Sequence, residues 1–305
     1  MKKERADRAR LLLDILPYLS AEKDIAIKGG TAINMFCRDF PRVSVDIDLV
    51  YLPLTPREET LDAIDAFLKR FAATIQRERF GATIVPRKTK QGRFIALTIE
   101  ERGSIVKIEP NTVLRGSVFP VEKCQVRPAV FSALDYEGFI NVQVLSVADL
   151  YGGKMCAALD RQHPRDLFDI MVLFENQGIT RALMQAFVIY LAGHDRPMSE
   201  LLCPRLLDMK EIHEKEFSGM TERHITWPEL ADVRTRLIAE IHAKLTRNDR
   251  NFLLSLKQGE PDWHLVEIPG IERLPSLQWK LLNIRQMNTV KRTEMVHRLA
   301  KILGV

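Results

Sequence analysis

Two carboxylates that are two residues apart, Asp46 and Asp48, lie in a run of apolar and β-branched residues typical of a strand. Side chains at such positions point to the same face of a strand. Paired acids in such a run repel each other unless a cation lies between them, and Mg²⁺ prefers one or two carboxylates together with substrate phosphates. The pair therefore predicts a magnesium site, although a solvated face or a turn would also account for it.

A second candidate feature is the glycine pair Gly29-Gly30, followed by Thr31. It comes between an apolar run, residues 25–27, and a helix-like segment, residues 32–38. Glycines before a helix leave backbone N–H groups where a phosphate can bind, and a plain tight turn is the alternative. A phosphate cradle and a magnesium site together are the minimum parts of an enzyme that transfers a nucleotide.

A third acid, Glu109, lies in an alternating run, Ile105 to Glu109. Lys107 and Glu109 share one face of this expected strand, and Ile108 points the other way. If the strand lies beside that of Asp46 and Asp48, Glu109 reaches the same metal. A solvent-facing ion pair of Lys107 with Glu109 is the equal alternative.

Charged residues recur at helical spacing later in the chain. Lys154 and Arg161 are seven residues apart, so they lie on one helix face two turns apart. Asp166 and Asp169 are three apart, at neighbouring positions of the next helix. Acids in a first helical turn often only balance the helix dipole, but here a basic face leads directly into an acidic one.

The glycine pair Gly152-Gly153 lies inside the helix that carries Lys154. Glycine costs about 1 kcal/mol per residue relative to alanine in a helix interior. Close approach of another backbone or a ligand would explain the pair, and close packing of two helices is the alternative.

The elements that must position these residues follow from hydrophobic periodicity. The first half predicts helices and short strands in alternation, and the second half is nearly all helical. Expected helices are residues 4–20, 57–79, 180–193, 199–216, 227–247 and 276–303, and expected strands are 82–86, 94–99, 105–109 and 139–144.

Length and composition set outer limits. The chain has 305 residues, of which 46% are hydrophobic, enough for one large or two ordinary domains with buried cores. No run approaches the roughly 20 apolar residues of a membrane span, and Asp14 interrupts the first apolar run after three leucines. The four cysteines are far apart and form no Cys-x-x-Cys pair. We therefore expect no signal peptide, no structural zinc, no disulfide framework and a cytoplasmic location.

The charge balance favours an anionic partner. The net charge is +5, and residues 271–305 contain seven Lys or Arg against two Glu. The last helix is therefore a candidate surface for nucleic acid, with an ordinary solvated basic face as the alternative.

Several motifs occur in a fixed order over residues 25–285, and together they resemble the AbiEii/AbiGii-type toxins, the nucleotidyltransferase-like toxins of type IV toxin–antitoxin and phage-abortive systems. The combination is specific, whereas each piece alone is not. The motifs are Gly29-Gly30-Thr31-Ala32, Arg42-x-Ser44-x-Asp46-Ile47-Asp48-Leu49, Lys154-x-x-x-Ala158-x-x-Arg161, Arg165-Asp166-Leu167-Phe168-Asp169 and Leu274-Pro275 with Gln278-Trp279-Lys280-Leu281.

The resemblance implies an α/β (α+β) fold, a polymerase-β-like nucleotidyltransferase with a mixed sheet flanked by helices. It further implies a nucleotidyltransferase-like domain over residues 1–178 and a helical C-terminal domain over residues 179–305. The broader superfamily has Gly-Ser where this chain has Gly-Gly-Thr, with a longer gap to the acids, so the resemblance does not fix the pose of the nucleotide.

The resemblance also assigns roles to the residues singled out above. A nucleoside triphosphate would be bound by the glycine turn, Ser44 and two cations, and Mg²⁺ by acids. Catalytic roles fall to Asp46, Asp48, Lys154, Asp166 and Asp169, substrate binding to Gly29, Gly30, Thr31, Ser44, Lys154 and Arg161, and metal binding to Asp46, Asp48 and, as candidate third ligand, Glu109.

The expected function is that of a Mg²⁺-dependent toxin that transfers a nucleotide from NTP to RNA, at the 3′ end of tRNA, and so arrests growth. Nucleotidylation of a small molecule or a protein is the second hypothesis, and NTP binding without transfer is the third. The resemblance implies a separately encoded DNA-binding antitoxin that acts without direct contact. We expect a monomer that contacts no membrane.

Overall fold

The computed structural model describes residues 3–305, and the chain forms two compact units. The first unit extends to Ser146 and also includes Gly219–Arg223, and the second comprises Val147–Ser218 and His224–Val305. The returning segment is hydrogen-bonded into the first unit, where the Val43 N–H donates to the Met220 carbonyl at 2.8 Å. These units are defined by contacts, whereas the boundary expected after residue 178 divides the chain by function, and that functional boundary stays a prediction.

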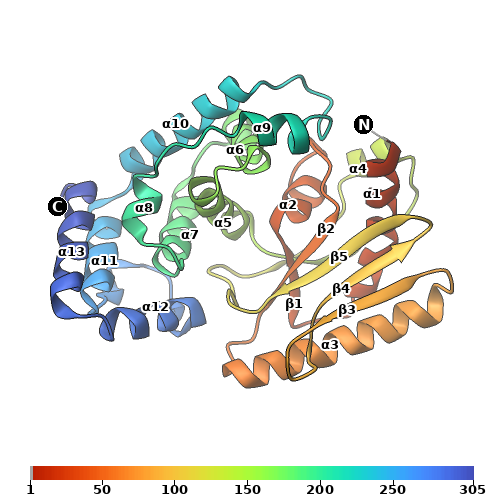
Figure 1. The fold of residues 1–305 in the computed structure, drawn as a ribbon, viewed down its shortest axis with the longest axis horizontal. Helices are drawn as coiled ribbons and strands as arrows, with labels where there is room; N and C mark the ends of the chain where they lie inside the picture. The colour runs from red at the N-terminus through yellow and green to blue at the C-terminus, as the bar shows by residue number, and fades with distance from the viewer. Residues whose placement is uncertain (1–2) are drawn as a thin grey trace. The chain divides into compact units, whose positions relative to one another are not determined.

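A seven-stranded mixed sheet organises the first unit (Figure 1). β2 is parallel to β5 and β1 is parallel to β7, and the remaining neighbours are antiparallel. The predicted mixed sheet flanked by helices is confirmed. The strands in sheet order are β3 (Thr83–Lys88), β4 (Phe94–Glu101), β5 (Ser104–Asn111), β2 (Asp46–Tyr51), β1 (Ile25–Lys28), β7 (Asn141–Val144) and β6 (Glu122–Gln125).

Along β5 and at the start of β2, apolar and charged side chains point to opposite faces of the sheet. Along β5, Val106 and Ile108 are buried, whereas Lys107 is exposed and Glu109 is half-buried. α1 (Lys3–Ile15) packs against β5, and α3 (Arg57–Glu78) packs against β4. The two-residue period of the strands therefore sends apolar residues into the core and leaves the acids on the other face.

The helix after the glycine turn begins earlier than expected. It starts at Gly29 rather than Ala32, as α2 (Gly29–Ala32), and continues as a π-helical turn, η2 (Ile33–Cys37). The first unit also contains η1 (Leu16–Leu19), a 3₁₀ turn after α1, and α4 (Pro128–Leu134), which the sequence reading missed. α4 is only two turns long, too short for a periodic signal.

The second unit is helical throughout. Its core is built on α5, against which α6 and α7 pack. Its elements are α5 (Val147–Asp160), α6 (Pro164–Asn176), α7 (Arg181–Ala192), α8 (Met198–Leu202), α9 (Lys210–Ile212), η3 (His213–Phe217), α10 (Trp227–Lys244), α11 (Arg247–Gln258), η4 (Trp263–Leu265), η5 (Ile271–Arg273), α12 (Pro275–Arg285) and α13 (Thr289–Leu303).

Two expected long helices are wrong. Residues 276–303 form α12 and α13, because Asn288 caps a new helix by accepting from the N–H groups of Val290 and Lys291. Residues 199–216 form α8, an irregular stretch, and then α9 with η3. Apolar spacing alone does not reveal such interruptions when a polar cap supplies the lost backbone hydrogen bonds.

The four cysteines, Cys37, Cys124, Cys156 and Cys203, are free thiols. Among residues 3–305, no helix is both long enough and apolar enough to cross a membrane.

Candidate active site

The turn between β1 and α2 consists of two glycines that lie directly against polar side chains. Gly29 has φ = +74°, in the left-handed region that favours glycine. A Cβ on Gly29 would lie 2.3 Å from Oδ2 of Asp48, and one on Gly30 would lie 2.8 Å from Nη2 of Arg42 and 2.9 Å from Oγ of Ser44. Side chains larger than hydrogen are therefore excluded, which keeps the helix start close to a carboxylate and a guanidinium.

Thr31 fastens this turn to β2. Its side chain is fully buried, and its Oγ1 donates to the carbonyl oxygen of Asp46 at 2.5 Å. The same Oγ1 lies 3.1 Å from Oγ of Ser44. The hydroxyl therefore holds the glycine turn, Ser44 and the start of the acidic strand in one fixed arrangement.

Asp46 and Asp48 lie on one face of β2, as predicted, and β5 lies beside β2, the condition under which Glu109 was expected to share that face. In the parallel register Asp46 is opposite Lys107 and Asp48 is opposite Glu109. On the other side of β2, Lys28 of β1 is opposite Asp48. Residues directly opposite each other point to the same face of a sheet, so Lys28, Asp48 and Glu109 form a row across three strands.

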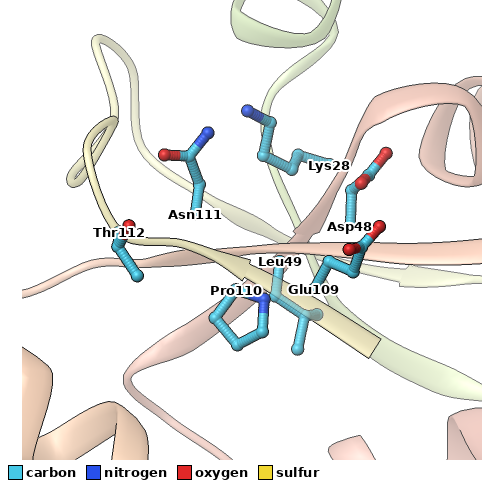
Figure 2. Close-up of a pocket in the computed structure, with 7 residues that line it drawn as sticks. All are labelled: Lys28, Asp48, Leu49, Glu109, Pro110, Asn111 and Thr112. Atoms are coloured by element: carbon cyan, nitrogen blue, oxygen red, sulfur yellow. The ribbon is translucent and has the colours of Figure 1, made fainter. Parts of the chain in front are cut away.

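A pocket with a volume of about 240 Å³ opens over this row. Figure 2 shows the carboxylates of Asp48 and Glu109 on one side of it, and the Lys28 ammonium and the Asn111 amide on the other. The residues that line it are Lys28, Asp48, Leu49, Glu109, Pro110, Asn111 and Thr112. Carboxylates, a cation and an amide thus converge on one small cavity.

Two of the acids have arginine partners near the surface. Nη2 of Arg8 lies 3.9 Å from Asp46, whose side chain is 39% exposed. Nη1 of Arg87 lies 3.4 Å from Glu109, whose side chain is 34% exposed. Pairs at such distances and exposures contribute little to stability, so both carboxylates can exchange partners at low cost.

The donor set fits a divalent cation of the magnesium type. Asp46 and Asp48 offer hard carboxylate oxygens beside a turn with no side chain to block access, and Glu109 lies on the neighbouring strand. Within residues 3–305, no three or more His, Cys, Asp or Glu side chains lie close enough to hold a metal ion together. Two carboxylates with water and phosphate oxygens would suffice for Mg²⁺, and Glu109 as third ligand stays a prediction.

The second group of predicted residues lies on α5 and α6 in the other unit. Nζ of Lys154 is 2.8 Å from Asp166 and 3.0 Å from Asp169. Arg161 holds Asp166 through two bonds, with Nε to Oδ2 at 2.5 Å and Nη2 to Oδ1 at 3.0 Å. The basic face of α5 and the acidic first turns of α6 therefore bind each other, and α6 is anchored to α5.

Burial separates the members of this group. The side chains of Lys154, Asp166 and Asp169 are 7%, 1% and 0% exposed, whereas that of Arg161 is 56% exposed. Burial alone would raise the pKa of Asp166, but the charges and hydrogen bonds of Lys154 and Arg161 outweigh it and hold that pKa well below its ordinary value. Asp166 is therefore an ionised partner of two cations.

One glycine of the pair on α5, Gly152, serves helix packing. A Cβ on Gly152 would lie 2.8 Å from Cβ of Ala186 and 2.8 Å from the backbone nitrogen of Phe187, both on α7. Gly153 has no atom within 4 Å of an added Cβ. Of the two explanations offered by the sequence, close packing of helices accounts for Gly152.

The structure thus assembles the predicted residues into two groups, one in each unit. The first contains Gly29, Gly30, Thr31, Ser44, Asp46, Asp48 and Glu109, and the second contains Lys154, Arg161, Asp166 and Asp169.

Sequence reasoning assigned no role to three residues at the first group. Arg42 is buried with its guanidinium beside Gly30. Lys28 and Asn111 line the pocket. A signal existed for both lining residues, because Lys28 directly precedes the glycine pair and Asn111 follows Glu109 by one strand period.

Comparison with known proteins gives a family match over most of the chain. The family described as nucleotidyl transferase AbiEii toxin, type IV TA system, matches residues 10–283. No curated protein matches the sequence.

Solved structures match as well. MenT4, a nucleotidyltransferase toxin from Mycobacterium tuberculosis H37Rv, superimposes with a TM-score of 0.59 at 14% identity, over 93% of this chain and 95% of that one. JHP933 from Helicobacter pylori matches with a TM-score of 0.44 at 17% identity, over 80% of this chain and 94% of that one. The likeness to MenT4 supports a common fold.

Proposed function

Because this chain belongs to the AbiEii family of nucleotidyl transferase toxins of type IV toxin–antitoxin systems, and is thereby a nucleotidyltransferase, we propose that it transfers a nucleotide from NTP to the 3′ end of tRNA in a Mg²⁺-dependent reaction. The product cannot enter translation, and growth stops.

One observation carries this proposal. The side-chain-free turn at Gly29 and Gly30 touches Asp48, and Asp48 is in register with Glu109 at a polar pocket. Backbone amides at a helix start suit phosphate oxygens, and the adjacent carboxylates suit Mg²⁺. A substrate that needs both at once is a nucleoside triphosphate.

The reaction is an in-line displacement at the α-phosphate. The acceptor hydroxyl oxygen forms a bond to phosphorus, pyrophosphate leaves, and the hydroxyl proton passes to solvent or a nearby base. Mg²⁺ bound by Asp46 and Asp48 would neutralise charge that develops on the phosphate oxygens. Arg42, Ser44 and Thr31 fix the turn that bears the triphosphate.

Positive charge for the phosphates comes, in this proposal, from Lys154 and Arg161. Asp166 and Asp169 hold the Lys154 ammonium at a fixed position, so its charge needs no reorganisation during the reaction. Arg161 combines a bond to Asp166 with an exposed side chain, which suits a residue that also contacts a ligand.

RNA is the proposed acceptor because the chain has a net charge of +5 and its last 35 residues are strongly basic. The family implies a partner antitoxin. We propose that it is a DNA-binding repressor that neutralises the toxin without touching it, and that the toxin acts in the cytoplasm as a monomer.

The test offers each labelled nucleoside triphosphate to the protein with Mg²⁺ and total RNA. We expect label to migrate with tRNA for the wild type, and the signal to disappear with EDTA and with Asp48→Ala. Parallel reactions with a protein lysate and with a small-molecule fraction serve as comparison. Label on protein or small molecules in place of RNA would contradict the RNA acceptor, and growth arrest by a folded Asp48→Ala variant would contradict the catalytic role of the acids.

A further inference from the structure

The pocket beside Asp48 has two chemically opposite sides. Asp48 and Glu109 present carboxylate oxygens on one side, and Lys28 and Asn111 lie on the other (Figure 2). Carboxylates accept hydrogen bonds, whereas an ammonium only donates them. The pocket is therefore built for a ligand with donor groups at one end and acceptor groups at the other.

The hydrogen bonds of Asn111 decide which of its amide atoms faces the cavity. Its Oδ1 accepts from the backbone N–H of Val113 at 2.9 Å and from that of Leu114 at 2.8 Å. Both lone pairs of this oxygen are thereby used. The Nδ2 group remains to donate toward the pocket, and Figure 2 shows it on the side of Lys28. Lys28 and Asn111 together form a donor edge.

The pocket is distinct from the glycine turn, although the two share Asp48. Gly29 touches Asp48 from the turn, while the described lining of the pocket contains Asp48 but none of Gly29, Gly30 or Thr31. An in-line displacement brings two reactants to the metal-binding acids from different directions. If the triphosphate occupies the turn, the pocket is open to the second reactant.

We propose that the pocket is the acceptor subsite and binds the terminal phosphorylated ribose of an RNA strand, with its hydroxyl toward Asp48 and Glu109 and its phosphate oxygens toward the donor edge of Lys28 and Asn111. This assignment rests on the proposed function. A ribose with an attached phosphate has the required polarity, because its hydroxyl donates and its phosphate oxygens accept.

Asn111→Asp tests the donor edge with minimal disturbance. The aspartate oxygen can still accept from Val113 and Leu114, so the loop keeps its anchor, but a donor facing the pocket becomes a charged acceptor. We expect the KM for RNA to rise about tenfold or more, because a lost hydrogen bond to a charged group is replaced by repulsion, while the KM for NTP stays within twofold. Lys28→Met should raise the KM for RNA in the same way.

Asn176→Asp is the control. Asn176 is exposed at the end of α6, where its Nδ2 donates to the Val172 carbonyl at 2.7 Å, outside the pocket and outside the basic C-terminal residues. The substitution makes the same chemical change, and both KM values should remain those of the wild type. Thermal unfolding of all variants verifies that they are folded.

The outcomes separate this inference from the proposed function. A rise in the KM for NTP alone would assign the pocket to the incoming nucleotide, and unchanged KM values would show that it binds neither substrate; each overturns the inference while transfer to RNA survives. If the wild type transfers nothing to RNA, the proposed function fails. Anisotropy with a labelled single-stranded RNA bearing a free 3′-hydroxyl then tests the subsite directly, and no binding, or equal binding by wild type and Asn111→Asp, overturns it.

Discussion

The two groups of charged residues differ most in how completely the protein satisfies them. Lys154 lies within 3.0 Å of both Asp166 and Asp169, and all three are nearly excluded from solvent. Asp46 and Glu109 are more than 30% exposed, with arginine partners at 3.9 and 3.4 Å. We call Lys154, Asp166 and Asp169 the closed group, because their charges pair with one another away from solvent. We call the acids of β2 and β5 the open group, because Asp46 and Glu109 are partly exposed and only weakly paired.

This difference indicates different structural roles for the two groups. A buried, fully paired cluster cannot release a partner without leaving an uncompensated charge, so it fixes geometry. Half-exposed acids with weak partners can bind a cation and then release it at little cost. The closed group therefore holds its charges in fixed positions, whereas the acids of the open group can exchange partners, and the following predictions test that contrast.

The largest expected effect is on stability, in the closed group. Lys154→Met removes the cation that two buried carboxylates share, leaves Arg161 as the cation beside Asp166, and should lower the free energy of unfolding by about 3–5 kcal/mol. Chemical denaturation provides the measurement. Lys107→Met, the same change at an exposed position of β5, should cost less than about 0.5 kcal/mol, and equal losses would remove the contrast between the groups.

The next effect is on activity, in the open group. Asp48→Asn should reduce kcat by about 10²–10³, the usual consequence of losing one group that stabilises transition-state charge. Its free energy of unfolding should stay level or rise, because repulsion between neighbouring acids is relieved. Asp62→Asn, on the exposed side of α3, should retain full activity; if both variants are equally active, Asp48 has no role in the chemistry.

Acid should weaken the contribution of Asp166 to stability. The pKa of Asp166 is lower in the folded protein than in the unfolded chain, so its stabilising contribution is complete above about pH 5 and is lost as the pH falls further. We expect the free energy of unfolding of the wild type to fall more steeply between pH 5 and pH 3 than that of Asp166→Asn. Parallel curves for the two proteins would show that Asp166 is not the group responsible.

The smallest effect concerns the arginine partner of Glu109. Arg87 is 63% exposed, and Arg87→Gln should change the free energy of unfolding by less than about 1 kcal/mol. A loss as large as that of Lys154→Met would mean that the open group is also structural.

The sequence predicted which acids share a strand face better than it predicted what surrounds them. The two-residue period placed Asp46 and Asp48 on one face, and Lys107 and Glu109 on another strand. That β5 runs parallel to β2 with Asp48 opposite Glu109 depends on pairing between distant segments, so it could be offered only as one possibility. The same two-residue period, extended from Glu109, predicts that Asn111 lies on the same face of the strand.

Contacts between helices were harder to foresee. The spacing of Lys154 and Arg161 indicated a basic face. Their ion pairs with Asp166 form only because α5 and α6 pack together, which helical spacing within one segment does not show. From the sequence, Gly152 was compatible with the close approach of a ligand or of another helix, and the structure shows Ala186 of α7 against it. The break before α13 depends on one asparagine side chain, a local competition that apolar periodicity does not register.

The short return of residues 219–223 to the sheet-bearing unit has a practical consequence for truncated forms of the protein. Val43 immediately precedes Ser44, and its N–H is bonded to the Met220 carbonyl. A fragment that stops at Ser146 would therefore lack the peptide that secures the approach to the acidic strand. Expression of the sheet-bearing unit alone would require residues 219–223 to be joined to it through a linker, because the unit is not one continuous stretch of the chain.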